Sequence, residues 1–392
     1  MDRRLLVLAL GMFALGTDSF IVAGILPQIS RGFGVSPGDA GQMTTVYAVT
    51  YALMAPTIAA IAARVSRKTL LLSSLTIFVI ANLATALSPN FGFALSTRVL
   101  AGIGAAMFAP TATGAASMMV PPERRGFALA IVIAGLSAST ALGSPVGAII
   151  GGLGNWRWTM AFVSGLAVLS GLGVWAMLSH IPLPPKVTLW QRVAPATDPR
   201  VALTLTCTLL YQAGHFLVYT YFSIVFNRIL GGNTWTLGAL LVLWGVCGTT
   251  ANLMIGRIVD KIGGRRVIVV MLVILAADLV WIPAASTQMW SAILAIAIWG
   301  CVSWGLLAPQ QHRLVFVAPQ AAPVVLGLNT SCTYLGVTSA GIVGALCLHS
   351  VGGHQLGYVG AVFVVAALVV AELAAWRIKA NVSKSSAALA SA

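Results

Sequence analysis

Twelve apolar stretches follow one another along this chain of 392 residues. Each is about as long as, or longer than, the roughly 20 residues that an α-helix needs to cross about 30 Å of hydrocarbon. Only 8% of the residues are charged, against about 25% in soluble proteins. The sequence therefore predicts an all-α membrane protein with twelve transmembrane helices. The stretches lie near residues 5–29, 40–62, 70–88, 91–119, 126–150, 158–180, 201–227, 235–256, 266–286, 289–312, 322–348 and 356–376.

The first stretch begins like a signal peptide, with basic residues ahead of an apolar run. The run continues past Asp18 to Ile29, however, and lacks a small-residue cleavage site. We therefore expect a retained first helix. The five cysteines all fall inside predicted spans without the spacing of metal ligands, which predicts apolar core residues and no metal or cofactor. They are Cys207, Cys247, Cys301, Cys332 and Cys347.

The net charge of +14 arises mainly from one side of the predicted membrane. The two termini and the segments that follow even-numbered spans hold most of the Lys and Arg residues, whereas the opposite segments hold only Arg31, Arg157 and Arg228. Because positively charged loops stay in the cytoplasm, both termini are predicted to be cytoplasmic. The charge thus indicates orientation in a lipid bilayer and argues against nucleic acid as a partner.

The two halves of the chain are similar to each other. The stretch AAIAARVSRK at 59–68 matches GRIVDKIGGR at 256–265 with a shift of 197, and Asn82 matches Asp278 with a shift of 196. A shift of six helices preserves direction through the membrane. The sequence therefore predicts two parallel six-helix repeats, which place a binding site at their interface near the midplane.

The joint between the repeats is the stretch 181–200, which is rich in proline and basic residues and is predicted to be a short cytoplasmic linker. The predicted domains are a six-helix bundle at 1–180 and a second at 201–392. We expect the last dozen residues, NVSKSSAALASA, to form a short disordered tail.

Two charged residues, Asp18 and Arg98, are expected deep in the membrane. A charge at the centre of a membrane helix costs roughly 2.5 to 3.5 kcal/mol on insertion scales. At a rise of about 1.5 Å per residue, Asp18 lies about 20 Å from one side and Arg98 about 10 Å from the other, which is nearly the same depth. They can therefore pair. The pair is either a proton-coupling site, in which Arg98 holds the ionised acid, or a structural clamp between the first and fourth helices. A further alternative is that backbone carbonyl groups satisfy Arg98.

His215 and Asp278 are further candidates for proton coupling. His215 lies about 20 Å into the seventh span, where the repeat places the counterpart of Asp18. It is either a second titrating group or a hydrogen-bonded core histidine. Gln212, His215 and Tyr219 share one helix face, which lines a cavity or forms an interhelical seam. Asp278 is a secondary candidate, because its repeat mate Asn82 indicates a position that requires a small polar group.

Several motifs together resemble the major facilitator superfamily, and within it the twelve-helix drug:proton antiporters that include chloramphenicol, sugar and purine-nucleoside exporters. The resemblance covers essentially the whole chain and implies the major facilitator fold. The motifs are FALGTDSFIVAGILPQIS at 13–30, the loop at 59–68, Arg98 with Ala101, Gly102 and Gly104, ALGSPVGAIIGG at 141–152, and NWRW at 155–158.

The loop after the second span resembles the gating motif GxLaDRxGRK of this family. The resemblance implies gating roles for Arg64, Arg67 and Lys68, and for Asp260 and Arg265 in the second copy. The chain departs from the pattern, since Ala59 and Ala63 replace the Gly and the Asp of the first copy. The basic residues therefore need other acceptors, such as helix C-termini.

The fifth-span motif contributes Gly143, Pro145 and Gly147. The family implies a gating role for this motif, and a proline kink can seal or hinge a cavity. The alternative is that the small residues serve helix packing alone.

An apolar pocket with few polar anchors is expected between the repeats. The alternative for some of its candidate residues is a position facing lipid or in an aromatic belt at the membrane surface. The candidates are Tyr47, Tyr51, Gln212, Tyr219, Trp304, Asn329 and Tyr334.

The resemblance implies a proton-coupled antiporter that exports lipophilic small molecules or drugs through the bacterial inner membrane. Export of sugars or purine nucleosides is an alternative within the same fold. A membrane-embedded lipid-modifying enzyme is the alternative from another class, but Glu123, Asp198 and Asp260 are scattered over separate loops. No GxxxxGKS nucleotide-binding loop occurs. We expect the partners to be protons, a small-molecule substrate and the lipid bilayer, and we expect a monomer.

Overall fold

The computed structural model describes residues 2–179 and 188–390. Twelve helical segments in these residues are long and apolar enough to cross a membrane, and the same residues contain no strand. The predicted twelve-helix, all-α fold is confirmed. The segments are α1 (Arg3–Phe33), α2 (Pro37–Ile61), α3 (Arg67–Ala86), α4 (Phe91–Met118), α5–α6 (Arg125–Leu153), α7 (Trp156–Met177), α9 (Pro199–Thr220), α12 (Thr234–Ile262), α13 (Gly264–Ala285), α14–α15 (Met289–Val317), α16 (Ala322–Ser350) and α17 (Leu356–Ala390).

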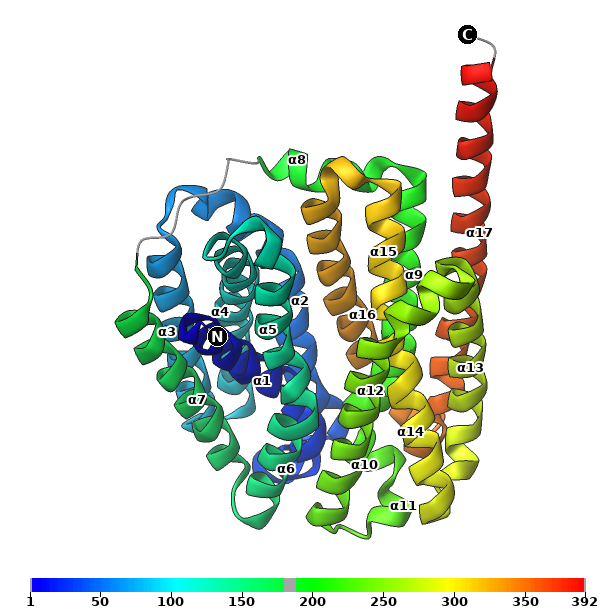
Figure 1. Cartoon of the computed structure of the whole chain (residues 1–392). Coiled ribbons are helices and arrows are strands. Elements are labelled where there is room, and N and C mark those ends of the chain that lie inside the picture. Colours follow the sequence, from blue (N-terminus) through cyan, green and yellow to red (C-terminus); the bar gives the residue numbers. More distant parts are fainter. Residues whose placement is uncertain (1, 180–187, 391–392) are drawn as a thin grey trace.

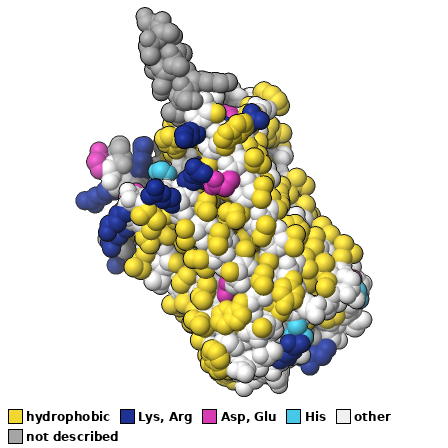
Figure 2. Space-filling model, turned by 90° about the vertical axis from the view of Figure 1, so that its right-hand side faces the viewer, with side chains coloured by type: hydrophobic (Ala, Val, Ile, Leu, Met, Phe, Trp, Pro, Cys, Tyr) yellow, Lys and Arg dark blue, Asp and Glu magenta, His cyan; other side chains and the backbone are white. Residues whose placement is uncertain are grey.

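The helices form two bundles side by side, α1 to α7 and α9 to α17 (Figure 1). The short helix α8 (Leu189–Val193) lies at one end of the molecule, which we call the linker side. The opposite end is the far side. Hydrophobic side chains cover the middle of one face, and basic side chains gather towards its ends (Figure 2). This distribution suits a helical protein that contacts lipid around its waist.

Three predicted spans are interrupted in the structure. A π-helical turn, Ser139–Gly143, separates α5 (Arg125–Ala138) from α6 (Ser144–Leu153). The tenth span divides into α14 (Met289–Gly305) and α15 (Leu307–Val317), with Pro309 in the first turn of α15, where its missing N–H is tolerated. The seventh ends at Thr220 instead of 227, and α10 (Phe222–Val225) and α11 (Asn227–Leu230) follow.

The described part of the linker and the tail both contain helix. Residues 181–187 of the predicted linker lie outside the described residues. Beyond them Asp198 caps α9 by accepting a hydrogen bond from the Arg200 amide at 2.8 Å, and the Arg200 side chain lowers the pKa of the Asp198 carboxyl. Helix α17 continues to Ala390, through most of the stretch expected to be disordered. That stretch contains no glycine or proline to end the helix.

The two bundles meet along two helix pairs, α2 with α16 and the α5–α6 segment with α12. Glycines allow the close approach: Gly38 lies beside Ala345 in the first pair, and Gly238 lies beside Ile149 in the second. These contacts begin at the far side. In the second pair α12 contacts mainly α6 and the π-helical turn and only slightly α5, so these helices diverge towards the linker side.

Candidate functional site

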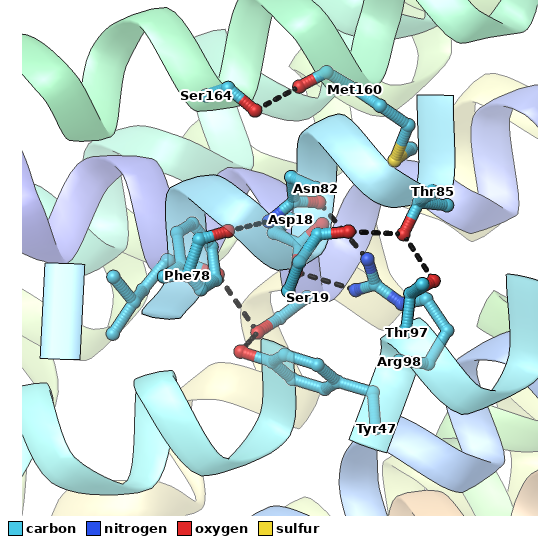
Figure 3. Close-up of polar contacts among 12 residues, drawn as sticks. Asp18, Ser19, Tyr47, Phe78, Asn82, Thr85, Thr97, Arg98, Met160 and Ser164 are labelled. Carbon is cyan, nitrogen blue, oxygen red and sulfur yellow. Dashed lines mark hydrogen bonds and ion pairs between the residues drawn. The ribbon is translucent and has the colours of Figure 1, made fainter. Parts of the chain in front are cut away.

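A buried ion pair joins α1 to α4 inside the first bundle. The Arg98 Nη2 atom donates a hydrogen bond to Asp18 Oδ2 at 2.5 Å, and both side chains are about 1% exposed or less (Figure 3). The predicted pairing of the two charges is present. A charge that is withdrawn from water in this way is stable only with a partner of opposite sign.

The small residues after Arg98 pack α4 closely against α2 and α3 and so help to bury the cation. A Cβ atom on Gly102 would lie 2.8 Å from the Tyr47 carbonyl oxygen of α2. A Cβ atom on Gly104 would lie 3.0 Å from the Ser74 carbonyl oxygen of α3. Any larger residue at either position would force the helices apart. The sequence RVLAGIG, residues 98–104, thus combines the cation with the close approach that buries it.

Asn82 completes the environment of the cation. Its Oδ1 atom accepts a hydrogen bond from Arg98 Nη1 at 3.0 Å, and its Nδ2 atom donates to the Phe78 carbonyl oxygen at 3.1 Å. The Arg98 guanidinium also lies 5.1 Å from the centre of the Tyr47 ring, within reach of a cation–π contact. Sequence reasoning singled out Asn82 only as the repeat mate of Asp278. Its bond to Arg98 depends on the packing of α3 against α4.

The pair retains unused hydrogen-bonding capacity. Among the described residues, Asp18 Oδ1 and Arg98 Nε are buried and have no hydrogen-bond partner. Asp18 Oδ1 is therefore a free acceptor in a site with little water access. Such an atom can accept a further hydrogen bond without first breaking one.

A polar chain leads from the ion pair towards the second bundle. Ser19 follows Asp18, and its hydroxyl donates a hydrogen bond to the Tyr47 hydroxyl at 3.0 Å. Tyr51, one turn along α2, stacks on Tyr334 of α16 with ring centres 3.9 Å apart. Three predicted cavity residues, Tyr47, Tyr51 and Tyr334, thus meet at the contact between the bundles.

Phe20 anchors a second group of predicted cavity residues. Its ring lies 5.8 Å from the ring of Tyr219 and 5.9 Å from that of Trp304. The Tyr219 hydroxyl donates to the Phe20 carbonyl oxygen at 3.2 Å. Phe216 completes the group at 6.1 Å from Phe20. The sequence flagged Tyr219 and Trp304, whereas Phe20 and Phe216 were missed because one apolar aromatic in an apolar helix carries no signal.

His215 belongs to a polar cluster of the second bundle. Its Nε2 atom lies 2.5 Å from Gln212 Oε1, and Gln212 Nε2 donates to the Thr333 hydroxyl at 3.3 Å. The rings of Trp244 and Trp299 surround the imidazole. Asn329, another predicted cavity residue, accepts a hydrogen bond from Thr208 at 2.9 Å and so joins α16 to α9.

Asp278 occupies a different environment from its repeat mate. Its side chain lies on α13 and is 4% exposed, and neither carboxyl oxygen has a hydrogen-bond partner among the described residues. Asn82, in the equivalent place, contacts a cation. Burial of an unpartnered carboxyl group disfavours its charged form.

The fifth-span motif packs α6 on α1. Cβ atoms at Gly143 and Gly147 would overlap Thr17 and Ile21 of α1, which lie one turn apart as the glycines do. Pro145 is the second residue of α6, in the first turn after the π-helical turn. Ser144, which sequence reasoning missed, donates to the Phe20 carbonyl oxygen at 3.2 Å and lies 3.4 Å from the Tyr219 hydroxyl.

The predicted gating residues of the first bundle lie at the linker side. Lys68 donates to the Trp175 carbonyl oxygen at 2.7 Å in the last turn of α7. This carbonyl oxygen lies at the C-terminus of α7, the kind of acceptor expected for the basic residues of the loop. Arg64 is exposed, and Arg67 faces a pocket that it shares with Arg192 of α8.

The second copy of the gating motif makes an equivalent contact. Arg265, at the start of α13, forms an ion pair with Glu372 of α17. Glu372 lies 197 positions after Trp175, so both bundles join the corresponding helices at corresponding places. Asp260 is exposed and makes none of the ion pairs found among the described residues. Sequence reasoning missed Glu372, although it is the only acid in the last predicted span.

Comparison with known proteins places this geometry in a family. The chain is 26% identical over 374 residues to the Bacillus subtilis "Uncharacterized MFS-type transporter YbcL", covering 93% of this chain and 94% of that protein. It is 25% identical to a "Probable sugar efflux transporter" of Helicobacter pylori, covering 91% of each.

Solved structures share the fold at low sequence identity. The nucleoside transporter NupG has a TM-score of 0.74 at 14% identity, with 95% of this chain and 98% of that chain covered. A bacterial homolog of the human lysosomal transporter Spinster, in an inward-facing and unoccupied conformation, has a TM-score of 0.75 at 16% identity, covering 95% and 96%. Residues 8–337 match the sequence profile of the Major Facilitator Superfamily. This chain therefore belongs to the Major Facilitator Superfamily of multi-pass membrane transporters.

Proposed function

We propose that this transporter is a proton-coupled antiporter that exports lipophilic small molecules through the bacterial inner membrane. The observation that carries the proposal is the buried Asp18–Arg98 pair, two residues before Phe20, whose ring contacts the second bundle. We place the linker side in the cytoplasm, as the distribution of basic residues predicts. The bundles at 1–180 and 201–392 then rock against each other as one monomer.

The ion pair supports coupling by competition for one carboxyl group. Protonation of Asp18 removes its negative charge and weakens its bond to Arg98. Arg98 keeps its charge, and its contacts with Asn82 and Tyr47 hold it in place. The change at Asp18 reaches the second bundle through Ser19, Tyr47 and the ring contact with Tyr334. One proton that crosses 100 mV supplies about 2.3 kcal/mol for export.

The aromatic groups around Phe20 and Tyr334 support a lipophilic substrate, because flat apolar rings bind such molecules with few polar contacts. Sugar export is the second candidate. The Gln212 amide and Thr333 hydroxyl provide hydrogen-bonding groups near the interface, and similar proteins from Helicobacter pylori carry the name probable sugar efflux transporter. Membership of a transporter family removes the lipid-modifying enzyme as an alternative.

Flux in proteoliposomes with an imposed pH step tests the coupling. We expect the native protein to move a fluorescent lipophilic compound against its gradient, and Asp18→Asn to bind that compound without gradient-driven flux. Glu123→Gln is the control, because it removes an exposed carboxyl from a loop. Equal driven flux in the native and Asp18→Asn proteins would exclude Asp18 from coupling. A labelled hexose moved in place of the lipophilic compound would establish the sugar alternative.

A further inference from the structure

A pocket of about 100 Å³ opens at the linker side of the first bundle. It lies between α2, α3 and α4 and is closed on one side by α8. Arg67 of α3 and Arg192 of α8 both line it. The other lining residues are mostly apolar, including Ile58, Leu70 and Met107, and none of them is acidic.

The two arginines lack a compensating anion. Each has a buried Nε atom without a hydrogen-bond partner among the described residues. Arg192 Nη2 donates to the Ala59 carbonyl oxygen at 3.1 Å, and burial lowers the pKa of the Arg192 guanidinium. The two like charges lie close enough to repel each other. Two partly buried cations without an anion are costly, so the pocket favours a negatively charged ligand.

The sequence accounts for the absence of an internal anion. The gating motif of the resembled family has an acid at the position of Ala63, four residues before Arg67. Alanine at this position leaves the basic cluster of the loop without its own carboxylate. A ligand can therefore supply the charge that the chain does not.

We propose that this pocket binds a phosphate oxyanion carried by the headgroup of an anionic phospholipid. Two guanidinium groups match the geometry of phosphate oxygens, which they bind through paired N–H donors. The apolar wall suits the glycerol and acyl portion of a lipid. Helix α8 exposes Leu189 (45%) and Trp190 (68%), as expected for a short helix at a membrane surface. Free phosphate shares the headgroup chemistry but would leave the apolar wall uncovered.

A ligand in the pocket would hold helix α8 of the linker against the first bundle. Helix α8 contacts both α2 of the first bundle and α16 of the second. An anion between Arg67 and Arg192 would cancel their repulsion and join α3 to α8. Because the ligand binds the folded protein, it would raise the melting temperature, and the rise would grow with the logarithm of the free ligand concentration above its dissociation constant.

The test measures melting temperature and lipid binding on the purified full-length protein. Phosphatidylglycerol, phosphatidylcholine and inorganic phosphate are added separately to detergent-solubilised protein, and bound lipid is counted by native mass spectrometry. Arg67→Gln and Arg192→Gln remove one cation each. Arg124→Gln is the matched control, since it removes an exposed cation from a neighbouring loop.

We expect phosphatidylglycerol to raise the melting temperature and to remain bound, and phosphatidylcholine to do neither. Each pocket variant should lose about tenfold in affinity, which corresponds to the loss of a charge-assisted hydrogen bond, while Arg124→Gln binds as the native protein does. If inorganic phosphate stabilised the native protein but neither pocket variant, and phosphatidylglycerol did not, the anion site would be supported and its ligand would be a soluble phosphate. The proposal would be overturned if neither phosphatidylglycerol nor phosphate stabilised the native protein more than phosphatidylcholine does. It would also be overturned if Arg67→Gln and Arg192→Gln bound phosphatidylglycerol as tightly as the native protein.

Discussion

At the scale of single residues, the buried charges of Asp18 and Arg98 each require the other for their stabilisation. Each is almost fully withdrawn from solvent, and each has one major partner of opposite charge. Breaking a buried pair by removing one member leaves an uncompensated charge, which costs about 3–5 kcal/mol. Replacing both members with neutral residues of similar shape avoids that penalty.

A double-mutant cycle follows from this dependence. We expect Arg98→Met alone to lower the free energy of unfolding by about 3–5 kcal/mol, because it strands the Asp18 carboxylate. The double variant Asp18→Asn, Arg98→Met should be more stable than Arg98→Met. Denaturant unfolding of the detergent-solubilised protein measures both. If the two substitutions proved additive, the pair would not act as a unit.

Substitution by leucine should lower the stability of the protein at Asn82 and raise it at the repeat mate Asp278. Asn82→Leu deprives Arg98 Nη1 of its acceptor, at a cost of about 1.5–3 kcal/mol. Asp278→Leu removes a buried carboxyl without a hydrogen-bond partner among the described residues, so the melting temperature should rise. Thermal unfolding of the two variants side by side gives the comparison. A fall in both would show that Asp278 has a stabilising partner.

The sequence predicted the ion pair because depth along a helix follows from counting residues at a fixed rise. It could not predict the contacts of Asn82 or Ser19, since these depend on the rotation of α3 and α1 about their own axes. Small polar side chains are also common in membrane helices, where most bond only to their own backbone. Of the candidate cavity residues, Asn329 binds Thr208 within the second bundle, which spacing along one helix could not reveal.

At the scale of helices, two glycines one turn apart, Gly143 in the π-helical turn and Gly147 in α6, set the contact with α1. We expect Gly143→Val to lower the free energy of unfolding by about 1–3 kcal/mol, because its side chain would overlap Thr17. Gly165→Ala in α7 is the control, since a Cβ atom there meets nothing within 4 Å. That substitution should leave the stability unchanged or slightly raised. Chemical denaturation of both variants in detergent measures the difference. Equal stability in Gly143→Val and the native protein would mean that the helices can separate freely.

The number of helices and their approximate bounds were predictable because long apolar runs have no other stable form in a membrane. The interruptions of the fifth, seventh and tenth spans could not be predicted in the same way. The early end of α9 accompanies the insertion of Tyr221 beside Gly41 and Gly344, where its hydroxyl donates to the Gly341 carbonyl oxygen at 2.9 Å. These partners lie on α2 and α16, more than 100 residues away along the chain, so no local pattern contains the signal.

At the scale of the whole molecule, the bundles are in contact at the far side through α2 with α16 and through α6 with α12. The rocking of the bundles proposed above requires the far-side contacts to open in each cycle. Gly38 of α2 and Ala345 of α16 form one of these contacts, with 3.3 Å between the Ala345 Cβ and a Cβ placed on Gly38. This spacing is close to the range of about 3.5–4.5 Å found in disulfides.

A disulfide at this contact should therefore stop transport. In a background with the five native cysteines replaced, we expect Gly38→Cys, Ala345→Cys to lose flux under oxidation and to regain it with reductant. Val7→Cys, Gly173→Cys is the control, because the same 3.3 Å separates these positions within the first bundle. Its crosslink joins α1 to α7, which move together, so flux should persist. Full transport by the crosslinked Gly38–Ala345 pair would show that the far side stays closed throughout the cycle, which rocking of the two bundles does not allow.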